Sequence, residues 1–502
     1  MNDVRDRLAP MFAEVLLLDE VGPDDSFFDL DGDSLAAVEL IRAIAGQFGV
    51  TVPIGDFFAA PTVNGVAALL DTADPEKSIG DIPRPDPVPL SPSQEGIWVT
   101  GMLTGWAGQY NLPVVVGAAE GVHLPTLEDA VRDVMRRHEI LRTRFPEHDG
   151  VPYQDILDVD AAFPGIRRTT RTVAEVSGED FDVTSEAPLR VVLADDGLVL
   201  LVHHLAADGP ALVTLMRDLD LAYGARRRGT PPEWPGPATQ YADFAVWQQR
   251  SLERRGDAAT SYWRERLRGA PLEILLPSAR PRPSLPGGGA ATVPLRLAPT
   301  LREQTVALAG AAGVTPFLVL QTAFAAALAE AGAGTDIVIG TPFSGRTHPD
   351  LEEAIGLFVN LVALRTDLSG QPSFRDLLAQ VRAADPFRHA DVPFGKVVEA
   401  VAPRRRSTVP PVVQVSLSLD GGGVTRLALP EIGERADLSP LRSAKFDLGL
   451  VLDSDQAGGF TGWIEYATEL YDAAAVEDLR DRFAARLENS LTDPDAPIPA
   501  GS

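Results

Sequence analysis

Two adjacent histidines followed by an aspartate are the residues of this chain that most directly suggest chemistry. His203 and His204 end the apolar run Leu198 to Val202 in the stretch LVHHLAADG, and the chain has only seven histidines. An imidazole titrates near neutral pH, so it can serve as a general base or acid. Successive side chains of a strand point to opposite faces, so only one of the pair can face a given cavity. The structural alternative is a strand end with two hydrogen-bonded histidines.

The aspartate of this stretch, Asp208, stands four residues after the second histidine. It can orient an imidazole or pair with an arginine. A buried carboxylate needs a partner, and we take Arg346 as that partner, with Arg142 and Arg144 as alternatives. On this interpretation Asp208 and Arg346 are structural residues at the active site. Gly209 relieves the backbone at the turn before the next helix.

A second chemical candidate is Ser34 in the stretch DSFFDLDGDSL. Gly32 allows a turn there, and a helical pattern begins near Leu35. A serine at this position is often a helix N-cap. The functional alternative is a hydroxyl that carries a phosphoryl group, because free N–H groups and the helix dipole stabilise an anion at a helix start.

Strands and helices must alternate to position these residues. Residues 198–202 form a continuous apolar run, which predicts a strand buried on both faces. The pattern predicts further strands at 114–116, 337–339, 361–364 and 412–419. It predicts helices at 126–137, 211–227, 301–312, 317–331 and 474–487. Such a mixture indicates an α/β or α+β fold.

The chain divides into a small acidic unit and a larger remainder. Residues 1–75 read as a compact helical unit with 14 acidic residues against three basic ones. Residues 76–88 are rich in proline, which favours an extended, semi-rigid tether. The remainder splits into 89–265 and 266–495, with a loop at the run PRPSLPGGG, and residues 496–502 form a tail that suggests a piece of a longer protein.

Composition limits the partners and the chemistry. The formal net charge of the 502 residues is -27, which argues against nucleic acid. We find no apolar run of the roughly 18 residues that span a bilayer, and the N-terminus lacks the apolar core of a secretory signal, so we expect a cytoplasmic protein without membrane contact. The chain has no cysteine, so it has no cysteine nucleophile or thiolate metal site. We expect no metal.

The first 75 residues resemble a peptidyl carrier protein of nonribosomal peptide synthetases. The stretch DSFFDLDGDSLAAVELI matches the core of that family, in which the serine of a Gly-Gly-(His/Asp)-Ser-Leu motif carries 4'-phosphopantetheine. Asp31 replaces the first glycine of the motif, whereas Gly32, Ser34 and Leu35 match. The resemblance implies a four-helix carrier domain with 4'-phosphopantetheine on Ser34. It also explains how a chain without cysteine handles a thiol, since the thiol belongs to the cofactor.

The rest of the chain resembles the condensation domains of the same synthetases. LVHHLAADG matches their His-His-x-x-x-Asp-Gly motif and, more distantly, the chloramphenicol acetyltransferase family. Six further motifs match in order: LSPSQEGIW (90–98) with YNLP (110–113), RHEILRTRF (137–145), YADFAVWQQ (241–249), IGTPFSGR (339–346) with IGLFVNLVALR (355–365), HADVPFGKVVE (389–399) and PPVVQVSLS (410–418). The resemblance implies an α/β domain of two chloramphenicol acetyltransferase-like lobes in a V shape, with a tunnel between them.

The same resemblance implies roles for the motif residues. His204, His203 and Gly209 form the catalytic group, in which His204 is central and His203 frames it. His204 either accepts a proton from the attacking amine or stabilises developing charge, and the residues leave both open. The N–H of Gly209 lies near the thioester carbonyl. Trp98 and Trp247 are core aromatics, and Asn360 and Gln414 either line the tunnel or form structural hydrogen bonds.

Departures from the family pattern bear on the reaction. Pro210-Ala211 stand where the family has Trp-Ser, which affects substrate fit. The paired aspartates of heterocyclising relatives are absent, and His203 is not the arginine of recruiting, inactive relatives. Both features favour a condensing enzyme. A non-catalytic docking module and an epimerase are the alternatives, and the glutamate motif of the epimerases is not evident.

We therefore expect a fragment of a nonribosomal peptide synthetase for secondary metabolite biosynthesis. Its carrier delivers a donor acyl or peptidyl thioester to the condensation domain, which forms a peptide bond with an aminoacyl thioester on a downstream acceptor carrier. The resemblance implies a phosphopantetheinyl transferase and an upstream adenylation domain as further partners. We expect a monomeric fragment. The residues leave open the donor and acceptor amino acids, the product and the configuration of the donor.

Overall fold

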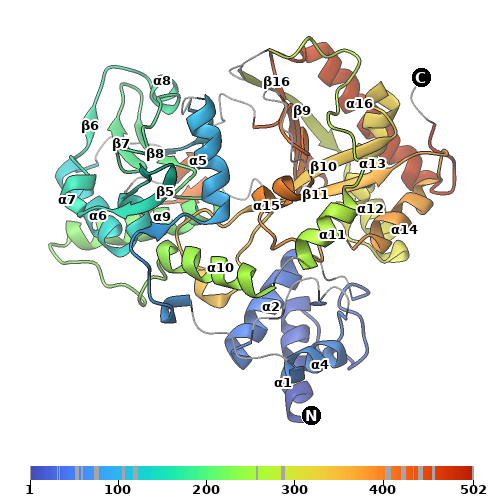
Figure 1. Ribbon diagram of the computed structural model, residues 1–502, viewed down its shortest axis with the longest axis horizontal. Helices are drawn as coiled ribbons and strands as arrows, with labels where there is room; N and C mark the ends of the chain where they lie inside the picture. Colours follow the sequence, from blue (N-terminus) through green and yellow to red (C-terminus); the bar gives the residue numbers. More distant parts are fainter. Residues whose placement is uncertain are drawn as a thin grey trace.

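The computed structural model describes most of the chain. The described residues are 2–30, 32, 34–50, 52, 56–57, 60–72, 79–104, 108–116, 122–255, 258–283, 289–385, 387–401, 409–419, 426–432, 435–438, 445–454 and 458–499. Figure 1 shows a small helical domain below two larger lobes that stand side by side.

The small domain is helical, as the sequence predicts. Its helices are α1 (Asn2–Leu16), α2 (Ser34–Phe48) and α4 (Val63–Thr72). Of residues 51–59, only 52, 56 and 57 are described. Phe12, Phe27 and Phe57 are fully buried and pack edge to face or tilted against one another. These aromatic contacts form the centre of the domain.

The connection to the lobes is shorter than the predicted tether. Residues 73–78 lie outside the described part, but Ile79 and Ile82 are buried against the first lobe. Arg84 donates to Asp243 at 2.6 and 2.9 Å and to Glu139 at 2.7 Å. Residues 79–88 are therefore held by buried apolar side chains and ion pairs, which proline spacing alone does not reveal.

The first lobe is built on a mixed six-stranded sheet in which the histidine strand is central. The strand order is β13-β14-β2-β8-β7-β6, and β8 runs antiparallel to both neighbours. Its strands are β2 (Asn111–Val116), β6 (Arg167–Arg168), β7 (Leu189–Leu193), β8 (Leu198–His203), β13 (Arg426–Ala428) and β14 (Arg435–Leu438). All six residues of β8 are buried, which confirms the prediction of a doubly buried strand.

Helices and a small second sheet complete this lobe. The helices are α5 (Pro92–Thr104), η2 (Gly108–Tyr110), α6 (Leu124–Arg137), η3 (Glu139–Arg142), α7 (Val159–Ala162), α8 (Val173–Ser177), α9 (Gly209–Arg227) and α10 (Tyr241–Arg255). The small sheet contains β1 (Val88–Pro89), β3 (Thr143–Arg144), β4 (Glu147–His148) and β5 (Val151–Ile156). In Figure 1, α5 lies on the side of this lobe that faces the second lobe.

The second lobe has its own six-stranded sheet with helices on one side (Figure 1). The order is β11-β10-β12-β15-β16-β9. Its strands are β9 (Ala290–Leu297), β10 (Asp336–Phe343), β11 (Asn360–Asp367), β12 (Val415–Leu419), β15 (Leu448–Ser454) and β16 (Phe460–Ala467). Its helices are α11 (Ala258–Arg266), α12 (Pro299–Ala312), α13 (Pro316–Leu328), η4 (Ala329–Ala333), η5 (Pro349–Leu351), α14 (Phe374–Ala383), α15 (Phe394–Val401) and α16 (Ala473–Thr492).

The lobes exchange segments, so a single boundary near residue 266 does not separate them. Strands β13 and β14 follow the second lobe in sequence, yet β14 pairs with β2 of the first sheet. Residues 346–359, which we call the strap, join β10 to β11. Five strap side chains belong to the buried core of the first lobe: Leu351, Ala354, Ile355, Leu357 and Phe358.

Residues 316–333 contradict the expectation that no segment of the chain is long and apolar enough to span a bilayer. This segment, which covers α13 and η4, is long and apolar enough to cross a bilayer, although the sequence analysis found no such run. Two-thirds of it is buried inside the protein, and Leu320, Phe324 and Leu328 are fully buried. Its packing is that of a core helix of the second lobe.

The strap leaves no space for a side chain at Gly356. A Cβ at this position would lie 1.9 Å from Cδ2 of Tyr241, whose hydroxyl donates to the carbonyl of Leu357 at 2.7 Å. Gly356→Ala is therefore expected to lower the free energy of unfolding by about 1–3 kcal/mol, because the buried ring must move. Urea unfolding measures this change. Gly236→Ala, where a Cβ meets nothing within 4 Å, is the control; equal stability of both variants would contradict this packing.

Candidate active site

His203 faces the interior of the first lobe. It is the last residue of β8, is 2% exposed, and lies opposite Asn111 of β2. Its ring packs against the rings of Tyr110 and Phe181, and its Nδ1 accepts the N–H of Leu205 at 3.2 Å. This bond fixes Nδ1 as an acceptor. The ring supports the loop that follows the strand.

His204 directly follows the last residue of β8, in a partly buried position. Its backbone N–H donates to the carbonyl of Tyr110, and its Nδ1 lies 2.7 Å from the carbonyl oxygen of Ala207. A carbonyl oxygen can only accept, so Nδ1 carries the proton. In the neutral ring Nε2 then has a free lone pair. The loop therefore presents His204 as a proton or hydrogen-bond acceptor.

Burial keeps both histidines uncharged. Burial lowers the pKa of His203 to about 3, with a smaller contribution from Arg190. Burial also lowers the pKa of His204 to about 3, and the charge of Lys445 adds to this effect. A charged imidazole loses hydration in such a place, so the neutral form is favoured at neutral pH. The imidazole of His204 is therefore uncharged at neutral pH.

The sequence analysis missed Lys445, a charged group near His204, and Glu465, whose charge acts on Lys445. Lys445 precedes β15, and burial lowers its pKa to about 8. Burial raises the pKa of Glu465 on β16, while the charge and the backbone N–H of Lys445 act against that rise. Both residues come from the second lobe. Nothing in their local sequence marks them, because only the folding of two distant segments brings Lys445 near His204.

Asp208 forms the expected pair with Arg346, and both side chains are buried. Oδ1 accepts Nη2 of Arg346 at 2.9 Å and the N–H of Ala211 at 3.0 Å. Oδ2 accepts the N–H groups of Phe358 and Val359 at 2.9 and 3.1 Å. The carboxylate therefore caps α9 of the first lobe and binds the strap. It bonds neither histidine ring, as expected for a structural residue.

The guanidinium of Arg346 also bonds the backbone of the strap. Nη1 donates to the carbonyls of Leu351 and Ala354 at 2.5 and 2.9 Å, and the guanidinium lies over the ring of Phe358. The alternative partners of Asp208 are engaged elsewhere: Arg142 donates to backbone carbonyls and Arg144 to Asp155.

Gly209 begins helix α9, directly after the capping aspartate. A Cβ at this position would meet nothing within 4 Å, so the glycine borders open space. Its N–H is among the first of the helix, where no intrahelical partner exists.

Ser34 is the first residue of helix α2. A Cβ at Gly32 would lie 2.3 Å from the ring of Phe27, so the turn before the serine requires glycine. No acidic residue stands in the first turn of α2. The helix start therefore suits a phosphodiester, which the free N–H groups stabilise. The side chain of Ser34 and the replacement at Asp31 lie outside what the structure describes.

The remaining predicted residues have structural contacts. Nε1 of Trp98 donates to the carbonyl of Phe145, and Trp247 is buried in the first lobe. The amide of Asn360 bonds the backbone at Ala390, Val392 and Phe394. The amide of Gln414 bonds the backbone at Ile274 and Pro410. Of the two interpretations, these contacts support structural hydrogen bonding.

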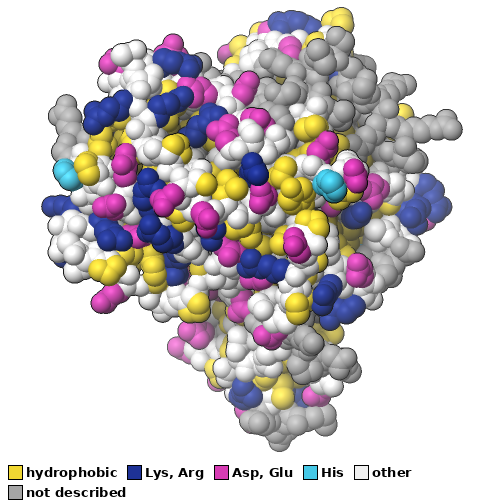
Figure 2. Space-filling view, turned by 60° about the vertical axis from the view of Figure 1, so that its left-hand side comes forward, with side chains coloured by type: hydrophobic (Ala, Val, Ile, Leu, Met, Phe, Trp, Pro, Cys, Tyr) yellow, Lys and Arg dark blue, Asp and Glu magenta, His cyan; other side chains and the backbone are white. Residues whose placement is uncertain are grey.

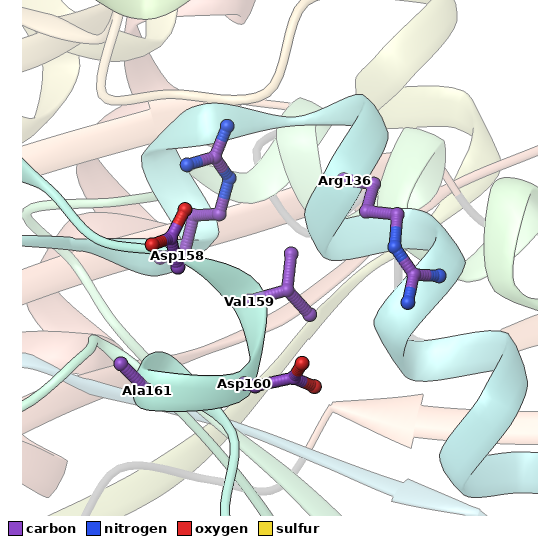
Figure 3. A pocket seen from close by; sticks show the side chains of 6 residues that line it. Arg136, Asp158, Val159, Asp160 and Ala161 are labelled. Atoms are coloured by element: carbon purple, nitrogen blue, oxygen red, sulfur yellow. The ribbon is translucent and has the colours of Figure 1, made fainter.

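An open surface pocket lies between α6 and α7, separate from His204. Figure 3 shows Arg136 on one side and Asp158 and Asp160 on the other. Its charges are already paired, since Arg136 bonds Asp133 and Asp160 bonds Arg132. Within the described part of the chain, no three His, Asp or Glu side chains are grouped to hold a metal ion.

Comparison with protein families matches almost the whole chain. Residues 85–500 match the model described as "Condensation domain", and residues 6–70 match the model described as "Phosphopantetheine attachment site". The dimodular nonribosomal peptide synthase of Bacillus subtilis (strain 168) is 38% identical over 98% of this chain. A protein of Salinispora arenicola (strain CNS-205) described as a "Probable non-canonical nonribosomal peptide synthetase" is 37% identical over 98% of the chain. The chain spans 22% and 7% of the length of these two relatives.

A solved structure shares the fold of the two lobes. The X-domain from teicoplanin biosynthesis superposes with a TM-score of 0.75 at 32% identity, covering 85% of this chain and all of that chain. The same domain has been solved in complex with OxyB. The matched fold agrees with the two expected lobes.

Loss of the Asp208 carboxylate is expected to be severe. Asp208→Ala leaves Arg346 buried without its counter-charge and removes the helix cap, which together cost about 3–5 kcal/mol. Thermal unfolding of the purified variant measures this loss, and Asp208→Asn is expected to retain part of the stability. Asp195→Ala, at an exposed position, is the control. A melting temperature of Asp208→Ala equal to the wild type would contradict the anchoring role.

The neutral histidines predict a dependence of stability on pH. Their folded-state pKa values of about 3 lie below the ordinary value of 6.5, so between these values the unfolded chain binds more protons. The contribution of the two neutral histidines to the free energy of unfolding is therefore expected to be fully present above pH 6.5 and to fall as the pH drops towards 3. Urea unfolding at pH 7 and pH 5 measures the slope of the free energy of unfolding against pH. This slope is expected to be smaller for His204→Ala. An unchanged slope would show that His204 titrates alike in both states.

Proposed function

Because the chain belongs to the condensation domain family of nonribosomal peptide synthetases, with a phosphopantetheine carrier domain in front, we propose that it forms peptide bonds. Its carrier delivers a donor acyl thioester, and an amine on a downstream acceptor carrier attacks that thioester between the lobes. The observation that carries this proposal is the orientation of His204, whose Nε2 is held as a free acceptor. The family is one of transferases, and the amide-forming reaction is the proposed specific activity.

Ser34 is the proposed attachment site of 4'-phosphopantetheine. The carrier domain of this family carries that group covalently, and Ser34 stands at a helix start without acidic residues in its first turn. When bound, the group supplies the thiol that holds the acyl substrate as a thioester. The residues of the helix start stabilise its phosphodiester through the N–H groups and the helix dipole.

The proposed roles of the active-site residues are supported by their contacts. Nε2 of His204 accepts a hydrogen bond or a proton from the attacking amine, while Ala207 fixes the ring. The N–H of Gly209 donates to the carbonyl oxygen on which negative charge develops. His203 and Asp208 hold the loop in place. The reaction forms one N–C bond, breaks one C–S bond and moves one proton from nitrogen to sulfur.

Positioning supplies much of the rate enhancement in this proposal. A thioester is already activated, and two substrates held in one site react as if intramolecular, which contributes several kcal/mol. A neutral imidazole then contributes as acceptor rather than as a cation. Of the two roles that the sequence leaves open for His204, we therefore favour the acceptor role over the stabilisation of developing charge.

A second candidate is recruitment of a partner protein. It is favoured by the 32% identity with the X-domain of teicoplanin biosynthesis, which forms a complex with OxyB. Against it stand His203 and His204, which retain the acceptor geometry described above. We therefore place recruitment second. The proposed partners of the condensing enzyme are a phosphopantetheinyl transferase, an adenylation domain and an acceptor carrier, and the proposed location is the cytoplasm.

Product formation tests the proposed reaction. Ser34 is loaded with an acyl-phosphopantetheine, and an aminoacyl group is offered on a separate acceptor carrier. We expect an amide by mass spectrometry, and we expect His204→Ala to lower its rate by about 10²- to 10⁴-fold, the usual effect of a lost acid–base group. His148→Ala, which removes an exposed histidine, is the matched control.

Two outcomes would contradict the proposal. No amide from the loaded wild type would favour the recruiting function, for which partner binding is then measured directly. Undiminished amide from a folded His204→Ala variant would remove His204 from the reaction. Ser34→Ala is expected to prevent loading, and loading of this variant would place the attachment site elsewhere.

A further inference from the structure

Gln94, a residue of the stretch LSPSQEGIW, is bonded to the loop that carries His204. It lies fully buried in the first turn of helix α5. Its Nε2 donates to the carbonyl of Leu205 at 2.9 Å, and Leu205 directly follows His204 in the loop. The bonded residues are 111 positions apart in the chain, so this contact holds the loop from a separate element.

The peptide groups of Leu205 are held on both sides. The N–H donates to Nδ1 of His203 at 3.2 Å, and the carbonyl accepts the amide of Gln94. The loop then continues to Ala207, whose carbonyl oxygen lies 2.7 Å from Nδ1 of His204. A rotation of the backbone at Leu205 therefore moves the two ends of the bond that orients the imidazole of His204.

The two ends of the Gln94 amide have different partners. Oε1 accepts the N–H of Ser91 at 3.1 Å, and Oγ of Ser91 accepts the N–H of Gln94 at 3.2 Å, which together form a capping box at the start of α5. The carbonyl of Leu205 needs a donor, and the NH₂ group supplies it. A carboxylate at position 94 would retain the capping contact and lose the contact with the loop.

The same helix start is bonded to the strap. Oγ of Ser91 lies 2.7 Å from the hydroxyl of Tyr241, which donates to the carbonyl of Leu357 at 2.7 Å. Burial raises the pKa of Tyr241, so the phenol keeps its single proton for Leu357, and Ser91 is the donor to Tyr241. Hydrogen bonds thus connect Gln94 to the strap, which binds Asp208 at the end of the His204 loop.

We propose that Gln94 is a positioning residue, whose amide holds the carbonyl of Leu205 so that the loop keeps Nε2 of His204 as a free acceptor. The inference rests on the proposed function, because it gives the orientation of His204 a consequence for amide formation. Gln94 acts through the loop and not by contact with the reacting groups.

Nitrogen-15 NMR of the full chain with labelled histidines measures the orientation without any reaction. The resonances of His204 are those that disappear in His204→Ala. In the wild type we expect a protonated Nδ1 and an unprotonated Nε2, because the carbonyl of Ala207 accepts from Nδ1. The opposite tautomer in the wild type would overturn the proposal, since the loop would then not hold the ring in this way.

Two variants of Gln94 separate the contact with the loop from the helix cap. Gln94→Glu keeps an acceptor for Ser91 and places an oxygen against the carbonyl of Leu205. Gln94→Met removes both bonds without introducing a charge. Each is expected to slow amide formation at saturating donor by about ten- to hundred-fold, because a displacement of about 1 Å costs this much. The KM for the loaded donor is expected to change little, and NMR is expected to show both tautomers of His204.

Two further variants are the controls. Trp98→Phe removes another buried donor of α5, which bonds the carbonyl of Phe145 away from the loop. It is expected to lower the melting temperature and to leave the rate and the His204 tautomer unchanged. Gln304→Glu makes the same change from amide to carboxylate at an exposed position of α12 and is expected to match the wild type.

The outcomes distinguish the role of Gln94 from the proposed reaction. No amide from the wild type, together with an altered His204 tautomer in Gln94→Met, would overturn the reaction and retain the positioning role. A folded Gln94→Met variant with the wild-type rate and tautomer would overturn the positioning role. A slower rate with an unchanged tautomer would also contradict it, as would an equal loss of rate in Trp98→Phe, which would assign the effect to the stability of α5.

Discussion

The carboxylate of Asp208 is the interaction on which the arrangement of the two lobes depends. It is buried and accepts four hydrogen bonds, of which one comes from its own helix and three from the strap. A buried charge is tolerated only when its partners replace the lost hydration. Because three of those partners lie on the strap that joins two strands of the second sheet, the carboxylate is satisfied only when the strap packs against the first lobe.

The geometry of the active site follows from that anchor. The loop between β8 and α9 has five residues, and it is fixed at one end by the ladder of β8 and at the other by Asp208. Within this short span the carbonyl of Ala207 meets Nδ1 of His204. A change at the anchor therefore also disturbs the acceptor. The strap extends the same dependence to Glu352, whose Oε1 lies 3.4 Å from Nη2 of Arg42 in the carrier domain.

Local sequence patterns were sufficient for β8 and for the start of α9. Residue types predicted that Asp208 pairs with an arginine, because a buried carboxylate requires a cation, and the structure selects Arg346 from the three candidates. The position of Lys445, the strands exchanged between lobes and the packing of residues 79–88 did not follow. Each depends on segments far apart in the chain, and their local sequence carries no periodic signal for such a contact.

The charges around His204 favour a neutral site. Burial disfavours any isolated charge, and Lys445 already supplies a positive one. A second cation, whether an imidazolium or the ammonium form of an incoming amine, is therefore disfavoured beside it. In the proposed reaction the neutral amine is the nucleophile, so the same electrostatics that keep His204 unprotonated also favour the reactive form of its substrate. In that proposed reaction Lys445 of the second lobe acts on His204 through its charge.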